Sequence, residues 1–179
     1  MNGFQSRGVL AIIWTSVSPM GRSVKETIQL DEIDRKLLRA LQHDASQSHA
    51  ALAEQVGASP ASCWRRIKAL ETSGVLQTSV RLVDAEKVGR GVNVMCQLRM
   101  KSHATAVRQE FEAFLRSRPE IMECHSMSGE WDYLMRVVVA DVAGYERFLM
   151  GALLNHPNVA NAASHFALSQ VKYSTAMPV

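Results

Sequence analysis

The stretch SPASCWRRIKALETSGVL, residues 59–76, predicts a short helix with a defined beginning and end. Ser59 is a good N-cap, Pro60 fits the first helical position, and Gly74 ends the helix. Three apolar residues recur at spacings of four and three, which places them on one face: Cys63, Ile67 and Leu70. This face is expected to pack against other helices.

A second face of the same helix carries cations and small residues, with no acidic residue among them. It consists of Ser62, Arg65, Arg66 and Ala69, at positions i, i+3, i+4 and i+7. A narrow, positively charged ridge of this kind fits the major groove of DNA, where arginine can bind guanine O6 and N7. An ordinary solvated helix face is the alternative, and the neighbouring sequence decides between the two interpretations.

Two further helices are predicted before this one. Asp31 caps the first, whose apolar residues fall on one face: Ile33, Leu37, Leu38 and Leu41. Ser48 starts the second, and Gly57 lies just past its end. A turn of about four residues that contains a glycine then leads to the third helix, which is the helix-turn-helix arrangement. The following stretch VLQTSVRLVD alternates like a short hairpin and predicts a wing.

These patterns predict that residues 28–83 form a winged helix-turn-helix domain that binds double-stranded DNA. The starts of helices expose backbone N–H groups that bind phosphate, so residues at helix starts are included. The predicted DNA contacts are Ser48, His49, Ser59, Ser62, Arg65, Arg66 and Lys68. Trp64 lies beside the buried face and is expected to pack against the first helix or the wing.

The second half of the chain shows alternating strand and helix patterns. VNVMCQLRM, residues 92–100, alternates as a strand with one buried face does, and a helix is expected over 104–116. Two strands joined by a turn at Gly129 and Glu130 follow, then a helix over 142–154 and a last strand. The order β-α-β-β-α-β predicts a ferredoxin-like domain with two helices on one face, so the fold class is α+β.

The two halves meet at VDAEKVGRGVN, where two glycines interrupt both periodicities. We expect residues 84–91 to be a hinge and residues 92–179 to be a domain for ligand binding and oligomerisation. The open face of a ferredoxin-like sheet carries apolar side chains and requires a cover. A second copy of the chain is the simplest cover, so we expect a homodimer.

The composition sets limits on the function. The 179 residues are 47% hydrophobic and 21% charged with a net charge of +3, which excludes a uniformly basic protein that coats nucleic acid. Three widely spaced cysteines without a CxxC pair predict reduced thiols in a cytoplasmic protein and no metal site. The apolar run VLAIIW is too short to span a membrane, and residues 1–27 are expected to be a flexible leader with Met20 as another possible start.

Three segments together resemble the Lrp/AsnC family of bacterial and archaeal transcription regulators: LDEIDRKLLRALQHDASQS, ASPASCWRRIKALETSGVL and ECHSMSGEWDYLMRV. The resemblance covers residues 29–173, and the third segment carries its most specific motif, S-G-x-x-D-Y. It implies a DNA-binding domain followed by a domain that dimerises, often assembles into octamers, and binds an amino acid or related small molecule between dimers. The effector-binding positions that it implies are Gly129, Asp132, Val142, His165 and Phe166.

The chemistry of these positions is compatible with an amino acid. Backbone N–H groups around the glycine turn can hold a carboxylate, and Asp132 can pair with an ammonium group. Val142 and Phe166 offer an apolar wall. Each residue also has a structural alternative, since Gly129 can supply a positive φ, Asp132 can cap the turn and Phe166 can pack in the core.

Three other functions are considered. An enzyme similar to the siroheme decarboxylases would share both domains and would use His125 or His165 on a tetrapyrrole. A metal sensor built on Cys124 and His125 is disfavoured, because adjacent strand residues point to opposite faces. The third is a regulator that binds DNA constitutively. No P-loop, GxGxxG, GxSxG or HExxH motif is present, so we expect a regulator without cofactor or catalytic residues.

Overall fold

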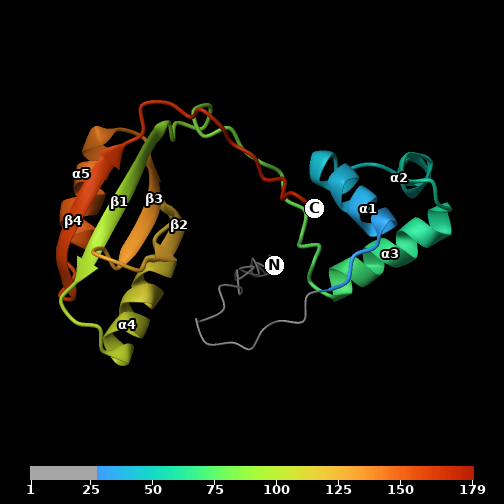
Figure 1. Ribbon diagram of the computed structural model, residues 1–179. Helices are drawn as coiled ribbons and strands as arrows, with labels where there is room; N and C mark the ends of the chain where they lie inside the picture. The colour runs from blue at the N-terminus through green and yellow to red at the C-terminus, as the bar shows by residue number, and fades with distance from the viewer. Residues whose placement is uncertain (1–27) are drawn as a thin grey trace, which may run out of the picture. The chain divides into compact units, whose positions relative to one another are not determined.

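The computed structural model describes residues 28–179, which form two compact units (Figure 1). The expectations for residues 1–27 lie outside this range. The chain divides between Leu76 and Gln77, before the expected hinge, and Met177–Val179 belongs to the first unit. This tail is held there by Gln42, whose side chain donates to the Met177 carbonyl at 3.1 Å and accepts the Met177 N–H at 2.6 Å.

Three helices build the first unit: α1 (Glu32–His43), α2 (His49–Val56) and α3 (Pro60–Thr72). The three predicted caps begin them, because the side chains of Asp31, Ser48 and Ser59 each accept the N–H three residues further on, at 2.9 to 3.2 Å. Gly57 follows α2 with φ 71°, in the left-handed conformation that suits glycine. The helix-turn-helix prediction is confirmed.

Apolar side chains from all three helices form one core. Leu37 of α1, Leu52 of α2 and Cys63 of α3 are at most 1% exposed. Ile33, Leu41 and Ile67 pack against them while remaining partly accessible. The predicted buried faces therefore meet, and they fix the direction in which the opposite face of α3 points.

The predicted wing is absent, because within the described residues no strand forms between α3 and residue 92. The alternating residues Val80, Leu82 and Val83 are 65% to 69% exposed. A two-residue alternation produces a stable strand only where a partner strand and a core accept its apolar face. This segment has neither, so the prediction of a wing was wrong.

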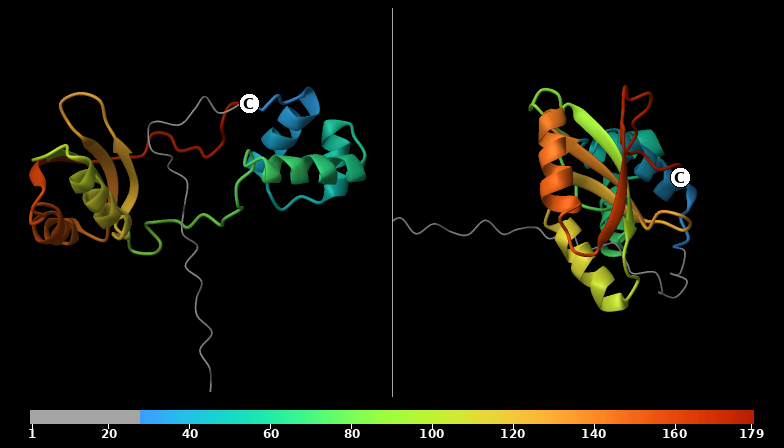
Figure 2. Two further views of the ribbon diagram at one scale, coloured as in Figure 1. Left: turned by 90° about the horizontal axis from the view of Figure 1, so that it is seen from below. Right: turned by 90° about the vertical axis from the view of Figure 1, so that its left-hand side faces the viewer.

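The second unit consists of β1 (Val92–Met100), α4 (Thr105–Arg116), β2 (Ile121–Ser126), β3 (Tyr133–Val139), α5 (Val142–Phe148), the π-helical turn η1 (Leu149–Leu153) and β4 (Val159–Phe166). The sheet has the order β2-β3-β1-β4 with all neighbours antiparallel. Helices α4 and α5 lie on the same face of it (Figure 2). The predicted ferredoxin-like plan is confirmed.

The core of this unit lies between the sheet and its two helices. Val94, Cys96 and Leu98 of β1 are fully buried and meet Phe111 of α4 and Leu153 of η1, which are also fully buried. The opposite face of the sheet is mixed in character. Met95 is 38% exposed there, and the neighbouring Arg136 bonds to Glu123 and Asn93. No helix among residues 28–179 has the length and apolar character needed to cross a bilayer.

Candidate nucleic-acid interface and ligand site

Arg65 lies on the exposed face of α3 and makes no hydrogen bond or ion pair with any residue that the structure describes. A shallow groove runs beside it, lined by Trp64, Arg65, Lys68, Ala69, Thr72 and Ser73. Lys68 lies one turn further along and bonds to Glu71 at 3.2 Å at the surface. A guanidinium held on a rigid helix with all its donors free can bind an anion or a base edge.

Arg66 has a different role from the one predicted. Its Nη1 donates to Asp31 Oδ2 at 2.7 Å and to Asp34 Oδ1 at 2.8 Å, and its side chain is only 25% exposed. Both acceptors belong to the capping box at the start of α1. The hydrogen bonds that Arg66 donates to Asp34 and, to a smaller extent, to Asp31 raise the pKa of Arg66. Arg66 therefore ties α3 to α1 and is not part of the exposed ridge.

Replacing Arg66 with alanine is expected to lower the melting temperature of the protein, because Asp34, 16% exposed, would lose its cation. Thermal denaturation followed by circular dichroism measures this effect. Arg39→Ala is the matched control, since Arg39 pairs with Glu32 at 3.6 Å across exposed surface and such pairs contribute little. Equal melting temperatures for the two variants would contradict the structural role of Arg66.

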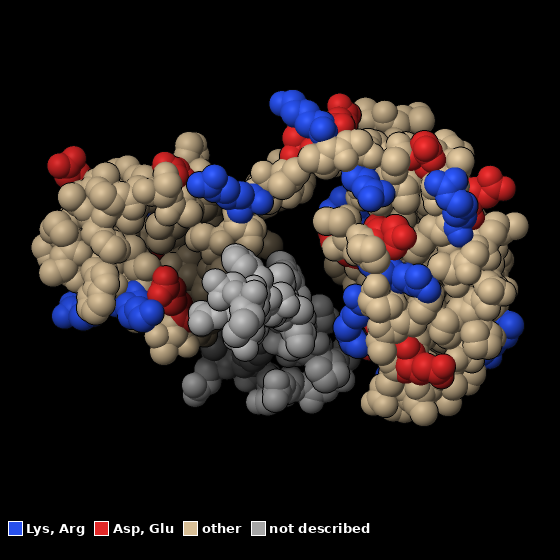
Figure 3. All heavy atoms as spheres, turned by 180° about the vertical axis from the view of Figure 1, so that it is seen from behind, with Lys and Arg blue, Asp and Glu red and all other residues tan. Residues whose placement is uncertain are grey.

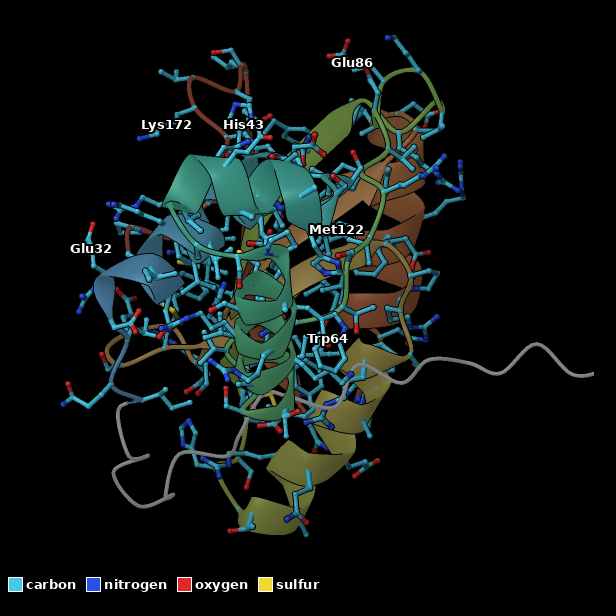
Figure 4. The ribbon with its side chains drawn as sticks, turned by 90° about the vertical axis from the view of Figure 1, so that its right-hand side faces the viewer. Glu32, His43, Trp64, Glu86, Met122 and Lys172 are labelled. Carbon is cyan, nitrogen blue, oxygen red and sulfur yellow. The ribbon has the colours of Figure 1, made fainter. Side chains whose placement is uncertain are left out.

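The other predicted DNA contacts lie at or near helix starts. The hydroxyl oxygens of Ser48 and Ser59 already accept the N–H groups that cap α2 and α3, but each hydroxyl can still donate its proton to a phosphate. His49 is exposed on the first turn of α2, and Ser62 is half-buried on α3. Trp64 is 57% exposed on α3 (Figure 4), contrary to expectation, because no wing is present to cover it.

Charge does not gather into one large patch on the face of the molecule seen in Figure 3, where Lys and Arg lie among Asp and Glu. This agrees with the small net charge of +3. Attraction of a polyanion to this face would therefore depend on a few placed cations rather than on the bulk charge.

Asp132 is bonded within its own chain. Its Oδ2 accepts the Met100 N–H at 2.7 Å, and its Oδ1 lies 2.8 Å from His103 Nε2. Burial alone would raise the pKa of Asp132, but the Met100 N–H and His103 outweigh it, and the pKa is lowered. Gly129 occupies the same β2–β3 turn with φ 117°, a conformation that side chains disfavour. The structural alternative for Gly129, a positive φ, is thus realised, whereas the Asp132 side chain bonds to Met100 and His103 rather than to the turn.

The remaining predicted effector residues lie at the other end of the sheet. Phe166 pairs with Val94 of β1, whereas the Asp132 N–H donates to the carbonyl of Leu98, four residues away or about 13 Å along the strand. Phe166 packs edge-on against Tyr145 with ring centroids 5.4 Å apart. His165 is exposed on the opposite face, and Val142 is 62% exposed at the start of α5. One chain does not bring the five residues together.

The histidines and cysteines considered for other functions are also separated. His125 and His165 lie on β2 and β4, the two outer strands of the sheet. Cys124 points to the opposite face from His125, and burial raises the pKa of Cys124 to about 11. Among residues 28–179 no three His, Cys, Asp or Glu side chains cluster closely enough to hold a metal ion.

Comparison with known proteins identifies both units. Residues 30–71 match the AsnC-type helix-turn-helix domain, and residues 93–177 match the Lrp/AsnC ligand binding domain. The DNA-binding transcriptional activator DecR of Escherichia coli K12 is 39% identical over 150 residues, which cover 84% of this chain and 99% of DecR. The glutamate uptake regulatory protein of Zymomonas mobilis is 34% identical over 151 residues, which cover 84% of this chain and 92% of that protein.

Solved structures give the same result. An AsnC family transcriptional regulator from Agrobacterium tumefaciens is 40% identical, with a TM-score of 0.79 over 83% of this chain and 97% of its own. A transcriptional regulator from Neisseria meningitidis, solved in complex with L-methionine, is 33% identical, with a TM-score of 0.80 over 84% of this chain and 97% of its own. These relatives are transcriptional regulators and not enzymes, so they give no support to the siroheme decarboxylase alternative.

Proposed function

Because the chain belongs to the Lrp/AsnC family of DNA-binding transcriptional regulators, we propose that it reads its operator through α3 and responds to an amino acid bound by its second unit. The observation that carries the first part is the exposed Arg65, which has no partner among residues 28–179 and lies on a helix that is capped at its start and tied to α1 by Arg66. Such a helix fixes the position from which the Arg65 side chain extends, and base recognition requires such a fixed starting point. A protein with this task acts in the cytoplasm, where the DNA lies.

Operator recognition is tested by a selection experiment. The purified protein selects DNA fragments from a random pool, with and without each amino acid, and the selected fragments are sequenced. We expect a pseudo-palindrome whose half-sites are about one helical turn apart, since two recognition helices related by two-fold symmetry produce that spacing. Absence of any enriched sequence would contradict the proposal.

The symmetry requires a homodimer, which we place at the open face of the sheet. Met95 lies in the middle of this face on β1, beside the polar group formed by Arg136 and Glu123. Met95→Arg is expected to shift the protein to a lower mass in light scattering, because it would bury an unpaired charge in the interface. Met150→Arg, on the helix side and 59% exposed, is the control. A dimer that persists in Met95→Arg would contradict this placement.

Assembly of dimers also explains how the separated effector residues act together. The Gly129 turn of one chain and the Phe166 end of another can meet only between copies, and octamers of the kind that the family resemblance implies provide such contacts. Addition of the right amino acid is expected to raise the melting temperature of the protein. A screen of the twenty amino acids in which none does so would instead favour a constitutive regulator.

Asp132 is expected to make the stability of the second unit depend on pH. Because its pKa is lowered in the folded protein, the carboxylate stabilises the fold above the unfolded pKa of about 4, and this contribution is lost as the pH falls further. Asp132→Asn is therefore expected to melt below the wild type at pH 7, and the difference in melting temperature should narrow as the pH falls below about 4. A gap that does not change with pH would contradict the bonding to Met100 and His103.

A further inference from the structure

A pocket in the second unit is lined by three arginines and one glutamate, none of which belongs to the sites described above. Arg90 precedes β1, Arg118 and Glu120 lie between α4 and β2, and Arg147 lies in α5. The wall between them comes from Val139, Gly144 and Ala152. Three separate segments therefore bring their charges to one cavity.

The charged groups of this pocket lack partners within the described chain. None of its three guanidinium groups forms an ion pair with a described carboxylate, and both Arg118 Nε and Glu120 Oε2 are buried without a hydrogen bond. Asp141, the nearby N-cap of α5, is already bonded to the Gly144 N–H at 2.6 Å. Buried polar atoms are nearly always paired in folded proteins, so these two groups are available to bind a ligand.

The geometry of the pocket favours a bound anion. The Arg118 guanidinium is held over the Phe114 ring, 4.5 Å from its centroid, which fixes its plane. Arg147 Nη2 lies beside Gly144, at 3.6 Å from where a Cβ would stand, so the absence of a side chain there keeps the approach open. Planar guanidinium groups bind carboxylates with two parallel hydrogen bonds.

We propose that this pocket binds an acidic amino acid, whose two carboxylates pair with the arginines and whose ammonium group pairs with Glu120. Three guanidinium charges and one carboxylate leave the pocket with a charge of +2, and this ligand provides a complementary group for each kind of charge. A neutral amino acid would leave guanidinium groups unpaired, and a plain dicarboxylate would leave Glu120 unpaired. The inference rests on the proposed function, in which the second unit binds an effector.

Arg90 links the pocket to regulation. It lies in residues 77–91, the part of the second unit that follows Leu76 and precedes β1, and a ligand that binds Arg90 restrains this segment. A ligand that favours one arrangement of the segment changes the population of arrangements available to the DNA-binding units.

Isothermal titration calorimetry of the full chain tests the pocket with L-glutamate, L-aspartate, glutarate, L-leucine and inorganic phosphate. We expect one of the two acidic amino acids to bind at least about tenfold more tightly than glutarate, leucine or phosphate. Arg147→Gln and Arg118→Gln should each weaken that binding at least about tenfold, whereas the exposed Arg108→Gln on α4 should not. Glu120→Gln should weaken the binding of the acidic amino acid, whose ammonium group loses its partner, but should not weaken the binding of glutarate.

Three results would overturn the inference: no binding of either acidic amino acid, binding that Arg147→Gln leaves unchanged, or phosphate binding as tight as theirs. Operator binding by the wild type is measured in the same preparation. If the protein binds its operator and a different amino acid alters that binding, only the proposal of an acidic amino acid in this pocket is contradicted. If the protein binds no operator, the proposed function is contradicted as well.

Discussion

Replacing Arg65 with alanine is expected to weaken operator binding by about 1 to 3 kcal/mol for each half-site, because the side chain would no longer hold a guanine edge. Arg65 is exposed and has no partner among the described residues, so the change removes no contact within the protein. The melting temperature should stay that of the wild type. Fluorescence anisotropy with a labelled operator measures the affinity.

The salt dependence of that affinity separates two ways in which Arg65 can act. If it reads a base, the variant loses discrimination at one position of each half-site and keeps most of the wild-type salt slope. If it binds phosphate, all sequences weaken alike and the slope falls by about one. Arg108→Ala in the second unit is the control, and unchanged operator affinity in Arg65→Ala would contradict the proposed interface.

Phe111→Ala is expected to cost about 3 to 5 kcal/mol of the free energy of unfolding, the usual range for a phenylalanine removed from a core. The Phe111 side chain is 0% exposed and lies against Tyr133 and His156, with ring centroids 5.5 and 5.0 Å away. Because the two units have separate cores, the loss should appear in the unfolding of the second unit alone.

Chemical denaturation followed by circular dichroism measures this loss. Met150→Ala serves as the comparison, because Met150 is 59% exposed and surface substitutions usually change stability by no more than about 0.5 kcal/mol. A loss in Phe111→Ala no larger than that of Met150→Ala would show that Phe111 does not anchor the core.

Local rules explain which elements were predictable from the sequence. Caps such as Asp31 and Ser59 act through atoms three residues away, so their effect can be seen in a short window. The period of two over residues 92–100 predicted β1 with its observed bounds, because one face of that strand is buried from Val94 to Met100. The same period over residues 75–84 failed, since the sequence does not show whether a core exists to receive the apolar face.

Interactions between distant segments explain what the sequence left open. Helical spacing placed Arg66 beside Arg65, but spacing does not show that a long side chain ends at Asp31 and Asp34 of another helix. Similarly, Arg90, Arg118 and Arg147 share no motif, and only the fold brings them to one pocket. An acidic pair at the start of one helix and two adjacent arginines in another helix indicate that an ion pair can form between the helices. They do not indicate which of the two arginines forms it.

Methylation interference on the selected operator tests the central claim most directly, because methylating guanine N7 blocks the acceptor that Arg65 is proposed to use. For the wild type we predict interference at a guanine in each half-site, and for Arg65→Ala we predict that this interference disappears while the other positions keep theirs. The same interference pattern for both proteins would show that Arg65 does not read the operator.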